Sequence, residues 1–311
     1  CISSAASDVY KRQVFESTLN PETRRSGGMH YTSIENIHKV IDPLFLDELK
    51  AEFEEIRNIA VKRTRERKLQ DFQKKLSTLT FLDPACGSGN FLTETYLSLR
   101  RLENEILQEL QGGQMVLGYD NMNPIQVSIS QFYGIEINDF AVTVAKTALW
   151  IAESQMMKET ESIVLMHLDF LPLKTNAFIH EGNALQVDWE SVIPKYQLSY
   201  IMGNPPFVAR AGRTKAKDSS SKGMLDDTQK TDRLNVFGED LGNVDYVACW
   251  FKKAAVFTKN TAIRCAFVAT DSICQGQQIY PIWKNILQDD IYINFASVSY
   301  THLTLPTICS V

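Results

Sequence analysis

The sequence has few of the features that define a protein class at a glance. None of its six cysteines forms a CxxC pair, and no His/Asp/Glu cluster has metal-ligand spacing. No uncharged apolar run approaches the roughly 18 residues of a membrane span. Lysine and arginine total 32 against 37 acidic residues, for a net charge of −5. These absences argue against a zinc or disulfide framework, a membrane protein and a uniformly basic nucleic-acid coat, and they fit reduced thiols in a cytoplasm.

Length and composition are those of a globular protein. The 311 residues, 44% hydrophobic and 22% charged, predict one large or two small domains with enough apolar material for a core. Residues 1–13 and 298–311 resemble translated sequencing-adapter read-through, so we expect both to be non-native flanks of an internal piece of a longer protein. The alternative is a frayed N-terminus and a genuine edge strand at the C-terminus.

Residues 14–78 predict an N-terminal helical segment. Apolar residues at helical spacing indicate one long helix over 42–75. The second half of this helix is rich in lysine and arginine. Its basic face either contacts phosphates or is a solvated surface balanced by nearby glutamates, and the sequence leaves both interpretations open.

From residue 79 the pattern changes to short apolar stretches that alternate with helices. This alternation predicts an α/β catalytic domain over 79–297, with a mostly parallel, doubly wound sheet covered on both faces. The expected strands are 79–82, 131–137, 178–185, 199–202 and 262–270, and the expected helices are 91–110, 140–156 and 246–257. Residues 209–243 are polar and poor in large apolar side chains, which predicts a long mobile loop.

A glycine loop follows the first predicted strand, with the sequence DPACGSGN over residues 83–90. Gly87 and Gly89 allow a tight turn and close approach of a ligand, and the next helix presents free N–H groups. The loop is neither a Walker A motif nor GxGxxG, so nucleotide readings are weak. In a doubly wound sheet a cofactor binds at this edge, where Asp83 could accept from a ligand ammonium. The alternative is a loop that only caps a helix.

Two further polar residues end strands at the same edge. Glu136 ends the second predicted strand, where a carboxylate can accept two ribose hydroxyls. Asn183 follows the third strand and could meet an adenine edge. Taken alone, either residue is better explained as an ordinary helix-capping or turn residue.

The fourth predicted strand runs into Asn204-Pro205-Pro206-Phe207. The lone pair of an exocyclic base amine is delocalised into the ring, so the amine is a poor nucleophile. The Asn204 side-chain oxygen and the Pro205 carbonyl could hold both N–H bonds and favour the pyramidal nitrogen during attack on a methyl group. Phe207 offers a flat face for an extruded base. The alternative is a rigid proline turn with Phe207 in the core.

Together, these motifs resemble the amino DNA methyltransferases. DPACGSGNFL, FYGIEIN, GNAL and GNPPF, in this order, are similar to N6-adenine enzymes of the gamma class, and GMHYTS over 28–33 resembles the upstream cofactor motif, with Ser33 in place of the usual proline. The resemblance covers residues 27–296. It is nearest to the methylase domain of large type IIG-like restriction–modification enzymes.

The resemblance implies a Rossmann-like methyltransferase fold, S-adenosylmethionine as cofactor and no metal. It implies that double-stranded DNA is the partner and that a flipped-out adenine receives the methyl group at N6, in a restriction–modification or phage-defence system. A target-recognition domain and a fused or separate nuclease would lie outside this chain. The implied cofactor-binding residues are Tyr31, Thr32, Asp83, Pro84, Ala85, Cys86, Gly87, Gly89, Glu136 and Asn183; the implied catalytic residues are Asn204, Pro205, Pro206 and Phe207. Arg210, Arg213, Lys215 and Lys217 would face DNA.

Two other functions remain open from the sequence. Protein-glutamine methyltransferases also hold an amide nitrogen with Asn-Pro-Pro-aromatic, although the upstream motif and the long segment after Phe207 favour DNA. A non-catalytic DNA-binding scaffold subunit could keep the same fold. The presence of Gly87, Glu136 and Asn204 argues against a scaffold.

Overall fold

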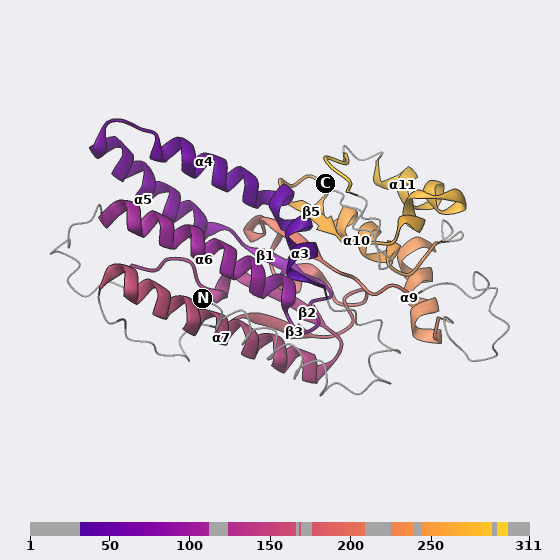
Figure 1. The fold of residues 1–311 in the computed structure, drawn as a ribbon. Helices are drawn as coiled ribbons and strands as arrows, with labels where there is room; N and C mark the ends of the chain where they lie inside the picture. Colours follow the sequence, from indigo (N-terminus) through magenta and orange to yellow (C-terminus); the bar gives the residue numbers. More distant parts are fainter. Residues whose placement is uncertain are drawn as a thin grey trace.

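The computed structural model describes residues 32–111, 124–165, 168, 176–208, 225–238, 244–287 and 291–297. Within them lies a five-stranded sheet in the order β3-β2-β1-β4-β5, in which every neighbouring pair is parallel (Figure 1). The strands are β1 Phe81–Asp83, β2 Phe132–Glu136, β3 Phe178–Glu181, β4 Tyr200–Gly203 and β5 Arg264–Phe267. The predicted α/β class and parallel sheet are confirmed.

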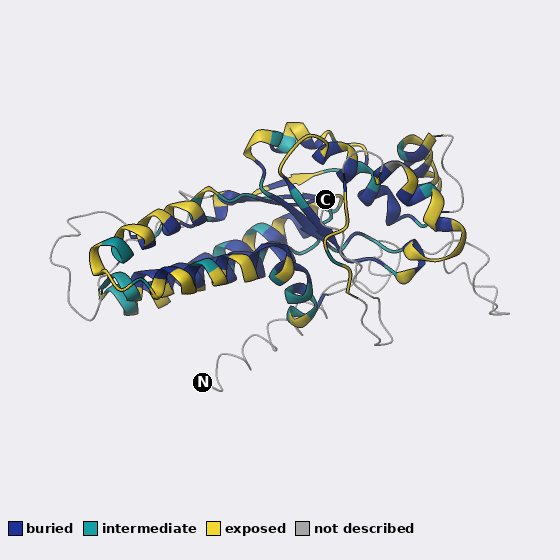
Figure 2. Cartoon of the chain, turned by 90° about the horizontal axis from the view of Figure 1, so that it is seen from above, coloured by how far each residue is buried: buried dark blue, intermediate teal, exposed yellow. Residues whose placement is uncertain are grey.

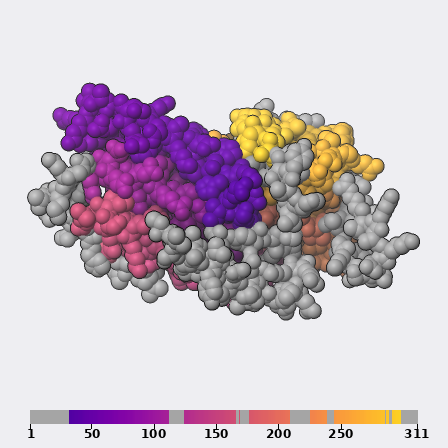
Figure 3. Space-filling model, viewed as in Figure 1, coloured from indigo at the N-terminus to yellow at the C-terminus, as the bar shows by residue number. Residues whose placement is uncertain are grey.

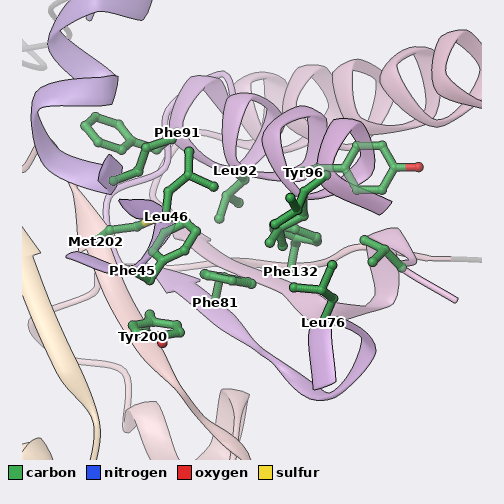
Figure 4. Close-up of a cluster of buried hydrophobic side chains, with 14 of the residues drawn as sticks. Phe45, Leu46, Leu76, Phe81, Phe91, Leu92, Tyr96, Phe132, Tyr200 and Met202 are labelled. Atoms are coloured by element: carbon green, nitrogen blue, oxygen red, sulfur yellow. The ribbon is translucent and has the colours of Figure 1, made fainter. Parts of the chain in front are cut away.

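The sheet is buried on both faces because successive strand residues point to opposite sides. Phe81, Tyr200 and Met202 belong to one core cluster, whereas Leu82 and Ile201 belong to the other. In the first cluster the Phe81 ring stacks between Phe132 and Tyr200, with ring centroids 5.2 and 5.4 Å away (Figure 4). The centre of the sheet is therefore enclosed by apolar residues on both faces, which fits a three-layer arrangement.

Helices cover both faces of the sheet. On one face α6 Asn90–Gln111 and α7 Asp139–Val164 lie side by side, with α5 Lys62–Thr78 next to α6 (Figure 1). The other face packs against α8 Trp189–Val192, α10 Ala248–Thr258 and α11 Ile279–Ile286. The helices carry buried and exposed strips along their length (Figure 2). Strands β1 and β4 are buried at every position. No helix of the described ranges is long and apolar enough to cross a membrane.

The single helix predicted over 42–75 is wrong. The chain forms α3 Ile34–Ile41, a π-helical turn Asp42–Leu46, α4 Asp47–Arg57 and then α5. The break comes after Asn58, whose side chain caps the Glu54 carbonyl, and at Val61, which is extended. Helices α4 and α5 fold back on each other because their apolar faces pack together. The rings of Phe53 and Phe72 stack between them, with centroids 6.2 Å apart.

The N-terminal helices reach across the molecule to the C-terminal part of the chain. Figure 3 shows the indigo N-terminal helices beside the orange and yellow C-terminal elements on one face. Arg264 of β5 makes the connection, since its Nη2 donates to Glu48 Oε2 at 2.7 Å and to the Tyr200 hydroxyl at 3.0 Å. The helical N-terminal segment is therefore part of the same packed body as the sheet.

The prediction of a loop throughout 209–243 is wrong for α9 Asp227–Phe237. Asp226 begins this helix with a capping box, in which its carboxylate accepts from the Gln229 N–H and the Gln229 side chain accepts from the Asp226 N–H. This Asp-x-x-Gln signal is present in the sequence but is outweighed there by the polar composition. Residues 209–224 and 239–243 lie outside the described residues.

A buried polar cluster joins α5 to α6 and α7 on the helical side of the sheet. Arg100 and Glu103 of α6 are fully buried and form an ion pair. Glu103 also accepts from the Gln73 amide at 2.8 Å and from two backbone N–H groups of 126–127, while Arg100 bonds Thr160 of α7 at 2.6 Å. The ion pair and these hydrogen bonds offset the cost of burying the two charges, although Arg100 Nε has no hydrogen-bond partner among the described residues.

We expect Glu103→Ala to destabilise the protein by about 3–5 kcal/mol, because it leaves a buried guanidinium without its carboxylate. Chemical denaturation followed by circular dichroism measures this loss. Glu105→Ala, an exposed position of the same helix, is the control and should change stability by less than about 0.5 kcal/mol. Equal effects of the two variants would contradict the role assigned to the cluster.

Candidate active site

The chain order reverses between β1 and β4, at the centre of the sheet. At such a switch point the loops after the two strands run in opposite directions and leave a crevice, where ligands bind in α/β sheets. The loop after β1 is the glycine loop that begins at Asp83, and the loop after β4 is Asn204-Pro205-Pro206-Phe207. The fold therefore brings the two predicted motifs together.

The glycine loop has a fixed shape that requires its glycines. Gly87 and Gly89 have positive φ angles of 54° and 82°, and a Cβ on Gly89 would lie 3.0 Å from the Ala145 Cβ of α7. The Cys86 N–H donates to the Ile135 carbonyl at 3.1 Å. The loop is thus held against β2 and α7, with helix α6 beginning directly behind it.

Glu136 lies at the end of β2 and holds this loop from the side. Its Oε2 accepts from the Gly87 N–H at 2.9 Å, and its Oε1 accepts from the Asn138 N–H at 3.0 Å. Burial raises the pKa of this carboxyl, and the backbone N–H groups counteract part of that rise. Each oxygen keeps a further lone pair that can accept a hydroxyl of a ligand.

Two apolar side chains flank Glu136 and were not identified as site residues from the sequence. Ile137 is 67% exposed and Phe140 is 52% exposed, although both are large and apolar. The position of Ile137 directly after the strand's acidic residue is the only sequence signal for them. Exposed apolar side chains beside a polar site offer a surface for a flat ring.

Asp83, at the end of β1, is 1% exposed. Burial raises the pKa of its carboxyl to about 8; the Ala85 N–H, which donates at 3.0 Å, counteracts the rise, and the charge of Glu136 adds to it. The end of the neighbouring strand β4 approaches so closely that a Cβ on Gly203 would lie 2.3 Å from Asp83 Oδ1. Glycine at 203 is therefore required for the two strand ends to meet.

Asn204 follows Gly203 and presents an unpaired acceptor. Its Nδ2 donates to the Thr32 hydroxyl at 2.9 Å, whereas its Oδ1 is buried and has no hydrogen-bond partner in the described part of the chain. A buried acceptor without a donor costs about 1–3 kcal/mol, so a ligand that donates a hydrogen bond there is favoured. Thr32, which is predicted as a cofactor residue, is buried and its hydroxyl lies against the Asn204 amide.

The rest of the turn is partly exposed. Pro205 is buried, while Pro206 and Phe207 are half-buried. Phe207 packs against both core clusters, so part of its ring supports the fold and part remains accessible. The sequence left open whether Phe207 offers a face to a base or belongs to the core, and its half-buried position lies between these two interpretations.

Asn183 has internal partners that the sequence does not reveal. Its Nδ2 donates to Asp232 of α9 at 2.8 Å, and its Oδ1 accepts from the Leu185 N–H at 2.9 Å. Asp232 is buried and also accepts from the Gln186 amide and the Tyr246 hydroxyl, each at 2.9 Å. One amide proton and one lone pair of Asn183 remain for a ligand.

Helix α10 holds the loops of two strands at once. Trp250 Nε1 donates to the Pro84 carbonyl of the glycine loop at 3.1 Å. One turn later, Lys253 Nζ donates to the carbonyls of Ala184, Leu185 and Val187 at 2.6–3.0 Å, in the turn that carries Asn183. Burial lowers the pKa of Lys253. Neither residue was predicted, since a Trp and a Lys three apart in a helix carry no specific signal.

Some predicted site residues lie outside the described residues, namely Tyr31, Arg210, Arg213, Lys215 and Lys217. The cysteines that are described, Cys86, Cys249, Cys265 and Cys274, are free thiols. In the described ranges no group of three or more His, Cys, Asp or Glu side chains could hold a metal ion. The described part of the site thus contains backbone amides, the buried carboxyls of Asp83 and Glu136, and the Asn204 amide with its unpaired oxygen.

A parallel sheet with this switch point, glycine loop and Asn-Pro-Pro-Phe turn has the α/β methyltransferase fold. Residues 59–304 match the family model described as the DNA-methyltransferase domain of MmeI, and the chain belongs to this family.

Named proteins and a solved structure that are similar to this chain agree with this family assignment. DNA methyltransferase A of Bacillus subtilis (strain 168) is 38% identical over 292 residues, covering 92% of this chain and 31% of that protein. The solved structure of the type IIL restriction–modification enzyme MmeI in complex with DNA has a TM-score of 0.80 and 42% identity, covering 94% of this chain and 38% of that one. The adenine-specific methyltransferase PglX of Streptomyces coelicolor is 32% identical over 74 residues, 24% of this chain and 5% of that protein. This chain spans about a third of the length of the first two relatives.

Asp83→Asn tests the raised pKa of the buried carboxyl. With a folded pKa of about 8 against an ordinary 3.8, the stability from the protonated carboxyl is fully present below about pH 4 and is lost as the pH rises through 8. Asparagine has no such dependence. We expect the native protein to lose stability relative to Asp83→Asn as the pH rises from 5 to 8.5. In thermal scans, the unfolding temperature of the variant minus that of the native protein should therefore increase over this range. If the two unfolding temperatures change with pH in parallel, the raised pKa of Asp83 is refuted.

Tyr246→Phe tests the anchoring of α9. It removes one of three donors to a buried carboxylate, so we expect a loss of about 1–3 kcal/mol in the free energy of unfolding, measured with urea. Tyr280→Phe is the matched control, because that ring is 67% exposed on α11. The control should lie within about 0.5 kcal/mol of the native protein. If both variants behave alike, the Tyr246 hydroxyl does not support Asp232.

Proposed function

We propose that this chain transfers a methyl group from S-adenosylmethionine to N6 of an adenine extruded from double-stranded DNA. The observation that carries the proposal is the buried Asn204 Oδ1, an acceptor without a donor at the switch point of the sheet. A base amine would supply the missing donor. The proposed setting is a restriction–modification or phage-defence system in the cytoplasm.

The residues at the cofactor end fit S-adenosylmethionine. When bound, this group supplies an electrophilic methyl on a sulfonium. The free lone pairs of Glu136 suit the two ribose hydroxyls, and Ile137 and Phe140 offer apolar surface for the cofactor's adenine ring. Asn183 retains one donor and one acceptor for the edge of that ring. Asp83 would receive the ammonium of the methionine end, which favours its ionised form.

Asn204 and Pro205 would activate the target amine. Both N–H bonds of the amine would be held by acceptors, the Asn204 side-chain oxygen and the Pro205 carbonyl. Such acceptors bind the pyramidal nitrogen of the attacking amine more tightly than the planar ground state, so they lower the barrier. No strong general base is required before attack. The accessible part of Phe207 would contact the face of the extruded base.

Adenine and DNA are supported by the relatives. PglX is named an adenine-specific methyltransferase, and the structure of MmeI is a complex with DNA. Both carry the resemblance over only part of their length. We therefore propose that sequence recognition requires a target-recognition region beyond this chain, and that a nuclease, fused or separate, completes the system.

Asn204→Ala should remove methyl transfer while S-adenosylmethionine binding stays within about threefold. Loss of a donor or acceptor aimed at the transition state costs about 100–1,000-fold in rate. The rate is measured in the full-length gene product with labelled S-adenosylmethionine and PCR-amplified DNA, and the cofactor affinity by isothermal titration. Glu136→Ala is the control and should lose both binding and transfer.

Product analysis decides the finer assignments. Nuclease digestion of the labelled DNA should give N6-methyladenine. N4-methylcytosine would keep DNA methylation but overturn adenine as the target, and label recovered only in protein glutamine would overturn DNA. An Asn204→Ala variant that loses cofactor binding and transfer equally would overturn the assigned role of the amide.

A further inference from the structure

The amide of Asn204 has two chemically different ends of nearly the same shape. A half-turn of the side chain exchanges an oxygen that only accepts hydrogen bonds for a nitrogen that only donates them. With the oxygen toward the base amine, the pair is complementary; with the nitrogen there, donor faces donor. The proposed reaction therefore needs the protein to select one orientation.

A threonine hydroxyl can accept or donate, so the preferred orientation depends on this contact together with the groups left unpaired at the other end of the amide. In the structure Thr32 contacts the nitrogen end. Its buried hydroxyl accepts from Asn204 Nδ2 at 2.9 Å, across 172 residues of sequence. Oδ1 then occupies the other side, shielded from solvent and without a partner in the described residues. The opposite orientation would leave two N–H donors in that place instead of one oxygen, and unpaired buried N–H groups are the rarer and less tolerated kind.

The position of Thr32 is itself fixed by the helix that follows it. Ser33 caps α3, since its hydroxyl accepts from the Asn36 N–H at 3.3 Å. The buried face of α3 packs into the first core cluster. His38 of α3 lies 3.3 Å from Glu94 of α6, the helix that begins directly after the glycine loop. Thr32 is thus held in a fixed relation to both the cofactor loop and the catalytic turn.

We propose that Thr32 is a positioning residue whose hydroxyl sets the Asn204 amide so that Oδ1 faces the amine of the target base. This inference rests on the proposed function and deepens it. It differs from the role that the family resemblance implies for Thr32, namely a cofactor contact, because the partner of the hydroxyl in the structure is the catalytic amide.

Two substitutions separate the hydroxyl from the rest of the side chain. Thr32→Val keeps the shape and removes the acceptor, whereas Thr32→Ser keeps the acceptor and removes the methyl group. In the full-length gene product, with PCR-amplified DNA, single-turnover methyl transfer by Thr32→Val should fall by about 10–100-fold, the range expected when a reacting group is misplaced. Thr32→Ser should stay within about threefold of the native rate. Isothermal titration should give both variants S-adenosylmethionine affinities within about threefold of native.

The outcomes are distinct. Weakening of S-adenosylmethionine binding in Thr32→Val by the same factor as the rate would make Thr32 a cofactor ligand and overturn the proposal. An unchanged rate in Thr32→Val would also overturn the proposal. A tenfold loss of rate in Thr32→Ser would overturn it as well. The serine variant keeps the test decisive if Thr32→Val does not fold. If the native protein itself forms no N6-methyladenine, the proposed function fails; if the native protein does so and Thr32→Val equals it, only the present inference fails.

Discussion

The contact between the ends of β1 and β4 is the constraint on which the site depends. Asp83 and Gly203 lie so close that the addition of one carbon at 203 would collide with the Asp83 carboxyl. This approach places the glycine loop and the Asn-Pro-Pro-Phe turn next to each other at the switch point of the sheet. It also excludes water from Asp83, and the same proximity that builds the site therefore shifts the pKa of its buried acid.

Around that contact, helices α9 and α10 carry none of the sequence motifs, yet they hold the loops that do. Helix α10 holds the glycine loop through Trp250 and the turn after β3 through Lys253. Helix α9 adds Asp232, which joins that turn to Tyr246. A loop held by partners on several elements loses little entropy when a ligand binds, so the arrangement is suited to pre-organised recognition.

Much of the fold could be predicted from the sequence because parallel strands buried on both faces read as short apolar runs, and those from Phe81, Phe132 and Tyr200 are clear examples. The glycine loop, Glu136 and Asn204 could be predicted because each follows such a run directly. The break between α4 and α5 could not, since it depends on Phe53 meeting Phe72 across the turn. The contacts of Asp232 with Asn183 and of Thr32 with Asn204 could not be predicted, because the partners are 49 and 172 residues apart and spacing along the chain does not encode those contacts.

Because the Asp83 carboxyl is buried, the binding of a cationic ligand beside it is coupled to the release of a proton. Near neutral pH the carboxyl is protonated in the unliganded protein, since its pKa is about 8. A cationic ligand group placed beside it stabilises the ionised form, so the proton passes to the buffer as the ligand enters. The heat of such a binding event then contains the ionisation enthalpy of the buffer, and titrations in phosphate and in Tris would differ by an amount that counts the released proton.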